Sequence, residues 1–164
     1  MLESELSYLV KQRPPLDGLA PVEIEQFYLS DTATPLRLRR YNQDRFELTK
    51  KIPVSQSDLS RQEEINIPLE AEEFSELRRL AKRGLRKLRY YLPLPDGLRA
   101  ELDIYEGPLA GLMSVEVEFP DEASRQRFQP PEWFGRDITQ EEWATNSYLA
   151  GKSLAEIEPH LLAE

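Results

Sequence analysis

Alternation of polar and apolar residues runs through most of this chain and predicts a protein built mainly from β-strands. About eight segments follow the period of two that a half-buried strand requires. Turn-forming residues separate them, and Asn42-Gln43-Asp44 and Pro95-Asp96-Gly97 are typical of hairpins. The predicted strands cover residues 3–10, 22–30, 36–40, 45–51, 61–67, 85–92, 98–105 and 112–119.

Helical spacing is confined to short segments late in the chain. Apolar residues recur at helical intervals within 71–83, and Gly84 stands where a helix C-terminus would stop. A short helix is predicted after Asp121, and loop and helix after Pro130-Pro131, where Thr139 can cap a turn. A final helix is predicted to begin at Ser153, with a capping box to its third residue.

These elements predict a mainly β (α+β) fold. Eight strands are about the number that closes a barrel, and the connections are short enough for antiparallel pairing. We therefore expect an eight-stranded antiparallel closed β-barrel tunnel with a polar, charged lumen and flanking helices. Residues 1–150 are expected to form the domain, and residues 151–164 a C-terminal helix that packs on it.

Like charges occur in pairs, two residues apart, in five of the predicted strands. Alternate residues of a strand share one face, so each pair lies about 7 Å apart on the same side. Like charges held so close repel, and an ordinary surface strand has no reason to collect them. The acidic pairs are Glu3/Glu5, Glu101/Asp103 and Glu116/Glu118, and the basic pairs are Arg37/Arg39 and Lys87/Arg89.

Two interpretations of these pairs stay open at this point. In the simpler one they are a solvated outer face, as in most antiparallel sheets. A solvated face, however, tends to mix its signs, whereas here the signs sort by strand, with Lys51 and Arg61 adding to the basic group. In the second interpretation the charged faces line the barrel interior, and the helices cover the apolar outside. We favour the second.

Composition narrows the function classes. The 164 residues carry a formal net charge of −9, which argues against general nucleic-acid binding but not against a local basic cavity. There are no cysteines and one histidine, so thiolate metal sites and histidine-based catalytic sites are disfavoured. No apolar stretch is long enough to span a membrane, and no signal peptide is apparent. A cytoplasmic protein without membrane or nucleic-acid partners is expected, and a homodimer is left open.

Carboxylates and cations in one cavity are suited to a metal-bound polyphosphate. Carboxylate oxygens are ligands for Mg²⁺ or Mn²⁺, and phosphate oxygens often complete the shell. Arginine presents a planar fork to phosphate, and lysine acts on it as a point charge. Tyr90, Tyr91, Tyr105, Trp133 and Trp143 are candidates for stacking on a base, although aromatic residues in strands are more often core.

The same residues resemble the CYTH domains, or triphosphate tunnel metalloenzymes. This family includes class IV adenylate cyclases, thiamine triphosphatases and inorganic triphosphatases. The similarity runs in order from Glu3 to about Ala150. It is carried by Glu3-Ser4-Glu5, Ile24-Glu25-Gln26-Phe27-Tyr28-Leu29, Arg37-Leu38-Arg39, Leu48-Thr49-Lys50-Lys51, Arg61-Gln62-Glu63, Lys87-Leu88-Arg89-Tyr90, Glu101-Leu102-Asp103, Glu116-Val117-Glu118 and Trp133-Phe134-Gly135-Arg136, with Asn146 in the closing segment.

The resemblance implies an eight-stranded tunnel and metal-dependent hydrolysis or cyclisation of a triphosphate. Mg²⁺ or Mn²⁺ is the implied cofactor, and a triphosphate or inorganic polyphosphate the implied ligand. The predicted metal ligands are Glu3, Glu5, Glu101, Asp103, Glu116 and Glu118. The predicted phosphate-binding residues are Arg37, Arg39, Lys51, Arg61, Lys87 and Arg89. Glu5, Lys87 and Arg89 are also predicted to take part in catalysis.

Three departures from the family pattern bear on activity. Ser7 stands where the family has the lysine that ends the opening Glu-x-Glu-x-Lys motif. Phe27 stands where the second strand of the family usually has a glycine. In the strand 61–67, Ile65 stands where the family usually has a second acid. This strand can therefore be shifted by one residue relative to the family pattern. The leading hypothesis is a metal-dependent triphosphatase. The alternatives are an adenylate cyclase of the same fold and a polyphosphate-binding module without activity, the latter motivated by Ser7.

Overall fold

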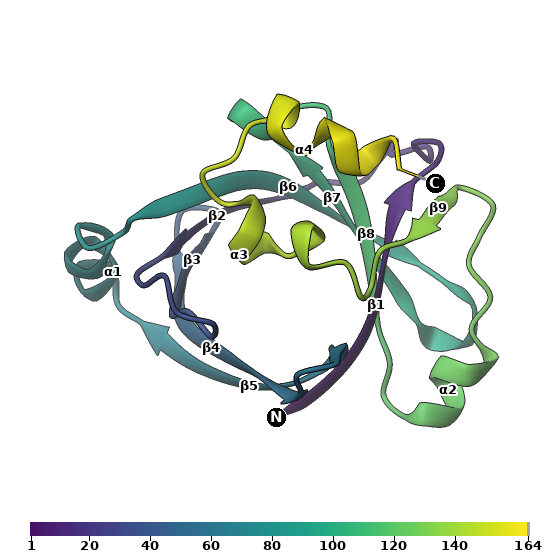
Figure 1. Ribbon diagram of the computed structural model, residues 1–164, viewed down its shortest axis with the longest axis horizontal. Helices are drawn as coiled ribbons and strands as arrows, with labels where there is room; N and C mark the ends of the chain where they lie inside the picture. Colours follow the sequence, from purple (N-terminus) through teal and green to yellow (C-terminus); the bar gives the residue numbers. More distant parts are fainter. Residues whose placement is uncertain (164) are drawn as a thin grey trace.

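The computed structural model describes residues 1–163 and shows a single ring of antiparallel strands (Figure 1). Residue 164 lies outside the described part of the chain. The strands are β1 (Leu2–Val10), β2 (Val22–Tyr28), β3 (Arg37–Tyr41), β4 (Arg45–Ser55), β5 (Asp58–Leu69), β6 (Arg83–Pro93), β7 (Arg99–Tyr105), β8 (Met113–Glu118) and β9 (Phe134–Asp137). The helices are α1 (Ala71–Arg78), α2 (Glu122–Arg127), α3 (Asn146–Leu149) and α4 (Leu154–Leu161).

Pairing between the first and fifth strands closes the ring. The sheet order is β5-β4-β3-β2-β6-β7-β8-β1-β9, and β1 also pairs with β5 through Leu2–Glu63 and Glu3–Gln62. The predicted eight-stranded antiparallel barrel is therefore confirmed. The ninth strand, β9, was predicted as loop or helix, and this was wrong. It extends the sheet beside the far end of β1, where Val10 pairs with Phe134.

Helices cover much of the outer, apolar face of the ring, as predicted. α1 packs Phe74 against Phe27 and Leu38 on the outside of β2 and β3. On the other side, aromatic residues that flank α2 and β9 cover β1, β7 and β8, with Phe128 and Phe134 against Tyr8. Burial of these apolar faces on the outside leaves the polar faces of the same strands in the interior.

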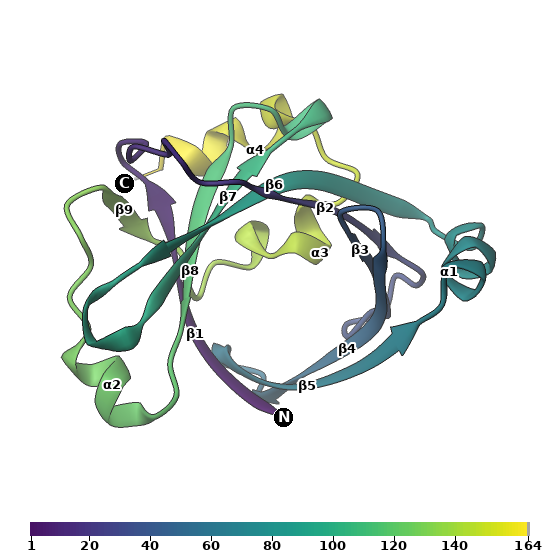
Figure 2. The same cartoon turned by 180° about the vertical axis from the view of Figure 1, so that it is seen from behind.

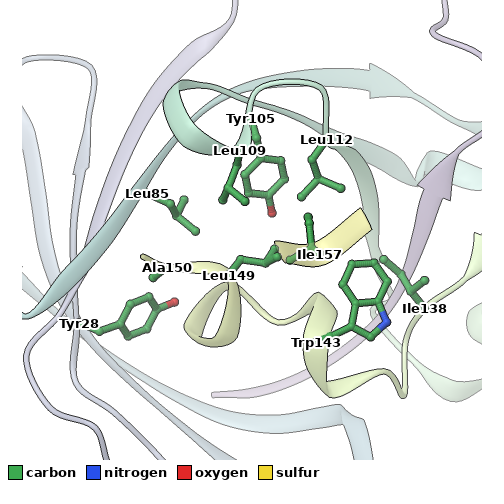
Figure 3. Close-up of a cluster of buried hydrophobic side chains, with 10 residues drawn as sticks. All are labelled: Tyr28, Leu85, Tyr105, Leu109, Leu112, Ile138, Trp143, Leu149, Ala150 and Ile157. Carbon is green, nitrogen blue, oxygen red and sulfur yellow. The ribbon is translucent and has the colours of Figure 1, made fainter. Parts of the chain in front are cut away.

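The segment that follows β9 crosses the opening of the ring (Figures 1 and 2). It carries a short 3₁₀ helix, Glu142–Ala144, and α3, and it is bonded to the barrel where the Gly151 N–H donates to the Gly84 carbonyl at 3.1 Å. Its apolar side chains form a cluster with strand residues and with Ile157 of α4 (Figure 3). The cluster comprises Tyr28, Leu85, Tyr105, Leu109, Leu112, Ile138, Trp143, Leu149, Ala150 and Ile157.

Two local predictions at helix ends need correction. α1 ends at Arg78, and Gly84 belongs to β6 rather than to a helix stop. Gly84 is the cross-strand partner of Phe27, and a Cβ built on it would lie 2.5 Å from the Phe27 ring. The bulky Phe27 is therefore accommodated by the glycine opposite it. Thr139 caps no helix, because its hydroxyl accepts from the Ser7 N–H at 3.0 Å.

The other predicted caps are confirmed. The Asp121 side chain accepts from the Ser124 N–H at the start of α2, and Ser153 and Glu156 form a capping box at the start of α4. Within residues 1–163, no helix is long and apolar enough to cross a membrane.

Candidate active site

The interior of the barrel holds a cavity of about 910 Å³ with strongly charged walls. Nine of the twelve predicted site residues line it, because their strands turn the same face inward. The interpretation that places the charged pairs inside the barrel is supported over the solvated alternative. The nine are Glu3, Glu5, Arg37, Arg39, Lys51, Arg89, Glu101, Glu116 and Glu118.

Five carboxylates on three adjacent strands form one side of the cavity, here called the acidic wall: Glu3, Glu5, Glu101, Glu116 and Glu118. Glu5 of β1 lies opposite Glu118 of β8, and Glu116 lies opposite Glu101 of β7. Burial raises the pKa of Glu5 to about 7, and the charges of Glu116, Glu3 and Glu101 add to the rise. Burial and the Glu101 and Glu5 charges also raise the pKa of Glu118. The acidic wall therefore holds more negative charge than its own cations compensate.

The opposite side, here called the cationic wall, consists of Arg37, Arg39 and Lys51 on β3 and β4. Neutral groups hold Arg39: its Nε and Nη2 donate to Gln26 Oε1 at 3.1 and 2.7 Å, and its Nη1 donates to the Tyr41 hydroxyl at 3.0 Å. Arg37 Nε is buried and has no hydrogen-bond partner among the described residues. Burial and the Arg39 charge lower the pKa of Arg37. Such a pair of buried cations favours an anion in the cavity.

Lys51 joins the two walls. Its Nζ lies 3.1 Å from Glu3 Oε2 and 3.3 Å from Glu64 Oε2. Burial alone would raise the pKa of Glu64, but the Lys51 charge and the hydrogen bond from Asn66 outweigh it and lower that pKa to about 2. Burial raises the pKa of Glu3 to about 7 despite the same lysine. Lys51 thus bridges Glu3 of the acidic wall and Glu64 of β5.

Arg61 was predicted to face the interior, and this was wrong. It points outward, where its guanidinium pairs with Glu122 just after β8, while Gln62 and Glu64 of β5 face the cavity. Ser4 of β1 pairs with Arg61 of β5, and both side chains face outward. This pairing sets which face of β5 lines the cavity. The sequence does not decide which face of β5 points inward. Residues 61 and 63 form a polar pair on one face of the strand, and residues 62 and 64 form a polar pair on the other.

Lys87 and Asp103 were predicted as a phosphate-binding residue and a metal ligand, but neither lines the cavity. Both side chains are fully buried, and Lys87 Nζ lies 2.6 Å from Asp103 Oδ2. Arg89 covers the other side of Asp103, with Nε 2.7 Å from Oδ1 and Nη2 2.8 Å from Oδ2. The two Asp103 oxygens are therefore occupied by cations. Lys87 and Asp103 form a buried layer behind the cavity wall. The Asn146 Oδ1 completes it by accepting from Lys87 Nζ and from the Tyr105 hydroxyl.

Arg89 lies between this buried layer and the acidic wall. Its Nη1 is 2.5 Å from Glu101 Oε2, and its Nη2 is 3.3 Å from Glu116 Oε2. Because Asp103 and the acidic wall surround it, the guanidinium is held in one orientation, and it orients both Glu101 and Glu116 in turn.

Several residues of the cavity wall were not predicted. Tyr28, Tyr41 and Glu64 are examples, and the segment 138–148 contributes further groups. Tyr28 and Tyr41 carried no charge signal, although their spacing from Gln26 and Arg39 on inward faces could have indicated them. Of the five aromatic residues considered for base stacking, Tyr91 alone lines the cavity.

The donor chemistry of the acidic wall fits a divalent cation. Buried carboxylates with raised pKa values gain from a cation that replaces their protons. Within residues 1–163, however, no three acidic or histidine side chains are gathered closely enough to hold a metal ion. A cation here would therefore be held by one or two carboxylates, with oxygen atoms of a bound ligand or of water completing its shell.

No protein-family model matches the sequence. An inorganic triphosphatase from Nitrosomonas europaea is 39% identical over 154 residues, covering 92% of this chain and 97% of the relative. An inorganic triphosphatase from Acetivibrio thermocellus is 36% identical over 121 residues, 73% of each chain. A crystal structure of an inorganic triphosphatase is 34% identical with a TM-score of 0.66, covering 90% of this chain and 93% of that one. The chain therefore belongs to the CYTH family, the triphosphate tunnel metalloenzymes.

Proposed function

We propose that this protein is a triphosphatase that hydrolyses inorganic triphosphate in the barrel cavity with Mg²⁺ or Mn²⁺. The observation that carries the proposal is the division of the cavity into an acidic and a cationic wall. A metal-bound polyphosphate matches both walls at once, whereas an anion or a cation alone matches one. The relatives that are 39% and 36% identical are inorganic triphosphatases, which supports the same reaction.

The cationic wall would bind the phosphate chain. Arg37 has an unpartnered buried N–H, and Arg39 is held in place by Gln26 and Tyr41. Lys51 would supply a point charge beside them once Glu3 binds the metal instead. These fixed cations would stabilise the negative charge on the phosphoryl oxygens as water attacks the terminal phosphorus and the P–O bond to the leaving diphosphate breaks.

The acidic wall would hold the metal. The proposed ligands are drawn from Glu3, Glu5, Glu116 and Glu118, with Glu101 oriented beside them by Arg89. Because no three carboxylates of the described chain are gathered closely enough to hold a metal by themselves, phosphate oxygens and water would complete the shell. A bound divalent cation supplies Lewis-acid stabilisation of the phosphate charge. The attacking water must lose a proton, and the carboxylates of the acidic wall are the acceptors within the cavity. We assign this role to the wall, with Glu5 at its centre, rather than to one oxygen.

Lys87 and Arg89 are assigned different parts from those of the sequence prediction. Arg89 lines the cavity, where it would position Glu101 and Glu116 beside a bound phosphate. Lys87 acts behind the wall by fixing Asp103, which in turn fixes Arg89. Both would act as positioning residues for the acidic wall.

The character of the walls favours inorganic triphosphate over a nucleotide. Tyr105 is buried with its hydroxyl on Asn146, Trp133 packs on the outside against Phe134, and Trp143 stacks on His160 at 5.2 Å. Tyr91 lies on the wall with the Arg99 guanidinium 4.2 Å from its ring centre. Tyr28, Tyr41 and Tyr148 also line the cavity, each with a cation over its ring, so most of the wall is suited to phosphate rather than to a purine.

A phosphate-release screen tests the proposal. Tripolyphosphate, ATP and thiamine triphosphate would each be supplied with Mg²⁺, with Mn²⁺ and with EDTA. We expect metal-dependent release of orthophosphate from tripolyphosphate above the other substrates. Cyclic AMP from ATP would instead indicate a cyclase. A rise in melting temperature with tripolyphosphate but no hydrolysis would indicate a binding module without activity.

A further inference from the structure

Arg45 lines the cavity but belongs to neither the acidic nor the cationic wall. It is the first residue of β4 and the cross-strand partner of Tyr41, so it lies beside the turn between β3 and β4. Arg45 is exposed at this edge of the ring. Within residues 1–163, no carboxylate oxygen lies within 4 Å of its guanidinium nitrogens. The Arg45 charge is therefore available to a ligand.

The Tyr41 ring holds the Arg45 guanidinium in place. The central carbon of the guanidinium lies 3.7 Å from the ring centre, which is a stacked contact. The ring is buried and is fixed at its hydroxyl, which accepts from Arg39 Nη1 at 3.0 Å and donates to Glu47 Oε1 at 2.5 Å. Stacking leaves the N–H groups at the edge of the guanidinium free to donate. Tyr41 thus sets the position of Arg45 relative to Arg39.

Arg45 extends the row of cations along the inner face of β3 and β4. Arg37, Arg39 and Tyr41 are alternate residues of β3, about 6.8 Å apart along the strand, and Arg45 lies across from the last of them. Because Arg37 and Arg39 are the proposed phosphate-binding residues, a phosphate chain that they hold can continue toward Arg45.

The opening of the ring beside Arg45 is not the one that the segment after β9 crosses. β4 runs from Arg45 to Ser55, and the turn into β5 follows at the opposite end. There the Leu59 N–H donates to Gln140 Oε1 at 2.8 Å, and Gln140 Nε2 donates to Asp58 Oδ1 at 2.9 Å, which ties the segment to that turn. An organic triphosphate would therefore carry its ester group at the Arg45 end, since the segment crosses the other opening.

We propose that Arg45 selects inorganic triphosphate over organic triphosphates by binding the free phosphate at the end of the chain that is not attacked. This inference rests on the proposed function and assigns its specificity to one residue. Both terminal phosphates of inorganic triphosphate are free, whereas the last phosphate of a nucleoside triphosphate is an ester with one negative oxygen fewer. A guanidinium fork gains most from the free phosphate. Arg45 also covers the Tyr41 ring, on which a base could otherwise stack.

Arg45→Gln, assayed on matched substrates, isolates this contact. Hydrolysis of tripolyphosphate, methyl triphosphate and ATP would be measured with Mg²⁺, because methyl triphosphate has the ester without the nucleoside. For tripolyphosphate, KM should rise about five- to tenfold while kcat stays within about twofold, since the lost contact lies away from the attacked phosphate. The values of kcat/KM for the two esters should not fall. The preference for tripolyphosphate over methyl triphosphate should therefore shrink by the same factor.

Arg40→Gln is the matched control, because Arg40 lies near the same turn but pairs with Glu25 at 3.0 Å and does not line the cavity. It should leave KM within about twofold. An unchanged KM for tripolyphosphate in Arg45→Gln, an equal loss for the esters, or the same loss in Arg40→Gln would overturn the proposal. Calorimetric titration with tripolyphosphate and methyl triphosphate separates it from the proposed function. In a protein without turnover, a loss of tripolyphosphate affinity alone in Arg45→Gln would still support the contact, and equal affinities in both proteins would refute it.

Discussion

The two walls of the cavity differ in how far the protein compensates its own charge. On the cationic wall, Arg39 is bonded to neutral groups of Gln26 and Tyr41, and Arg37 Nε has no partner among the described residues. On the acidic wall, Arg89 contacts Glu101 and Glu116, but much of its charge is already used by Asp103. The positive charges of Arg37 and Arg39 are therefore not paired with carboxylates, whereas Lys51 is paired with Glu3 and Glu64. The five carboxylates of the acidic wall outnumber the cations that contact them.

This difference indicates how the two walls respond to ligands. The cationic wall is preorganised for an anion, because its side chains are fixed before the anion binds. Burial, together with the neighbouring carboxylates, raises the pKa of Glu3 and Glu5 to about 7, so the acidic wall without metal favours protons on some of its carboxylates. The acidic wall should thus depend on metal and on pH, and the cationic wall should set the affinity for phosphate.

The largest effect is expected from Glu116→Gln on the acidic wall. Loss of this carboxylate removes a proposed metal ligand and a partner of Arg89, so kcat for tripolyphosphate should fall by about two orders of magnitude or more. Steady-state phosphate release measures it. Glu122→Gln, which changes the outward partner of Arg61, is the matched control and should retain activity. Unchanged turnover in Glu116→Gln would remove the residue from the site.

Arg37→Gln tests the cationic wall and should mainly affect KM. A charged hydrogen bond to phosphate contributes about 1.5–3 kcal/mol, so KM should rise about 10- to 100-fold. The substitution also removes a buried cation beside Arg39, and the ligand-free melting temperature should therefore rise. Arg61→Gln is the outward control, with KM unchanged. An Arg37→Gln variant with normal KM would show that phosphate binds elsewhere.

The acidic wall should also make stability depend on pH. Folding raises the pKa of Glu3 and Glu5 from 4.5 to about 7, so the folded protein binds more protons than the unfolded chain between these values. Metal-free stability should then fall as pH rises through this window. Mg²⁺ binds the ionised carboxylates, so it should raise the melting temperature more at pH 8 than at pH 5. The Glu5→Gln variant should show a smaller pH dependence, and equal Mg²⁺ effects at both pH values would contradict this account.

The smallest effect is expected from Ser7→Lys. Ser7 lies opposite Glu116 on the inner face of β1, so a lysine there would add a cation to the acidic wall. Attraction to phosphate and competition with metal for Glu116 oppose each other, and kcat/KM should change by no more than about tenfold. Ser7→Ala should be neutral. An increase of several orders of magnitude would show instead that the missing lysine limits the natural enzyme.

Sequence reasoning predicted the barrel and most of the charged residues that line its cavity, because alternation along a strand is a local property. Pairs such as Arg37 and Arg39 must share one face, and the apolar residues between them must share the other. The same logic failed for Arg61, since two overlapping polar pairs on β5 fit either register. The pairing with Ser4 of β1, distant in sequence, decides it.

Depth along the barrel was not predictable by the same means. Lys87 and Arg89 lie on one face of β6, yet Lys87 is sealed beneath Asn146 while Arg89 reaches the cavity. Periodicity gives the face of a residue but not its distance from the cavity, which depends on where the segment after β9 packs. β9, which precedes that segment, was missed for another reason: it is a strand of four residues whose sequence carries little alternation.

Diffraction from crystals soaked with Mn²⁺ and a non-hydrolysable methylene-bridged triphosphate would test the central claim most directly. The account predicts an anomalous manganese peak between the carboxylates of β1 and β8, with phosphate density against Arg37, Arg39 and Lys51. Manganese bound only on the outer surface, or phosphate density away from both walls, would contradict it.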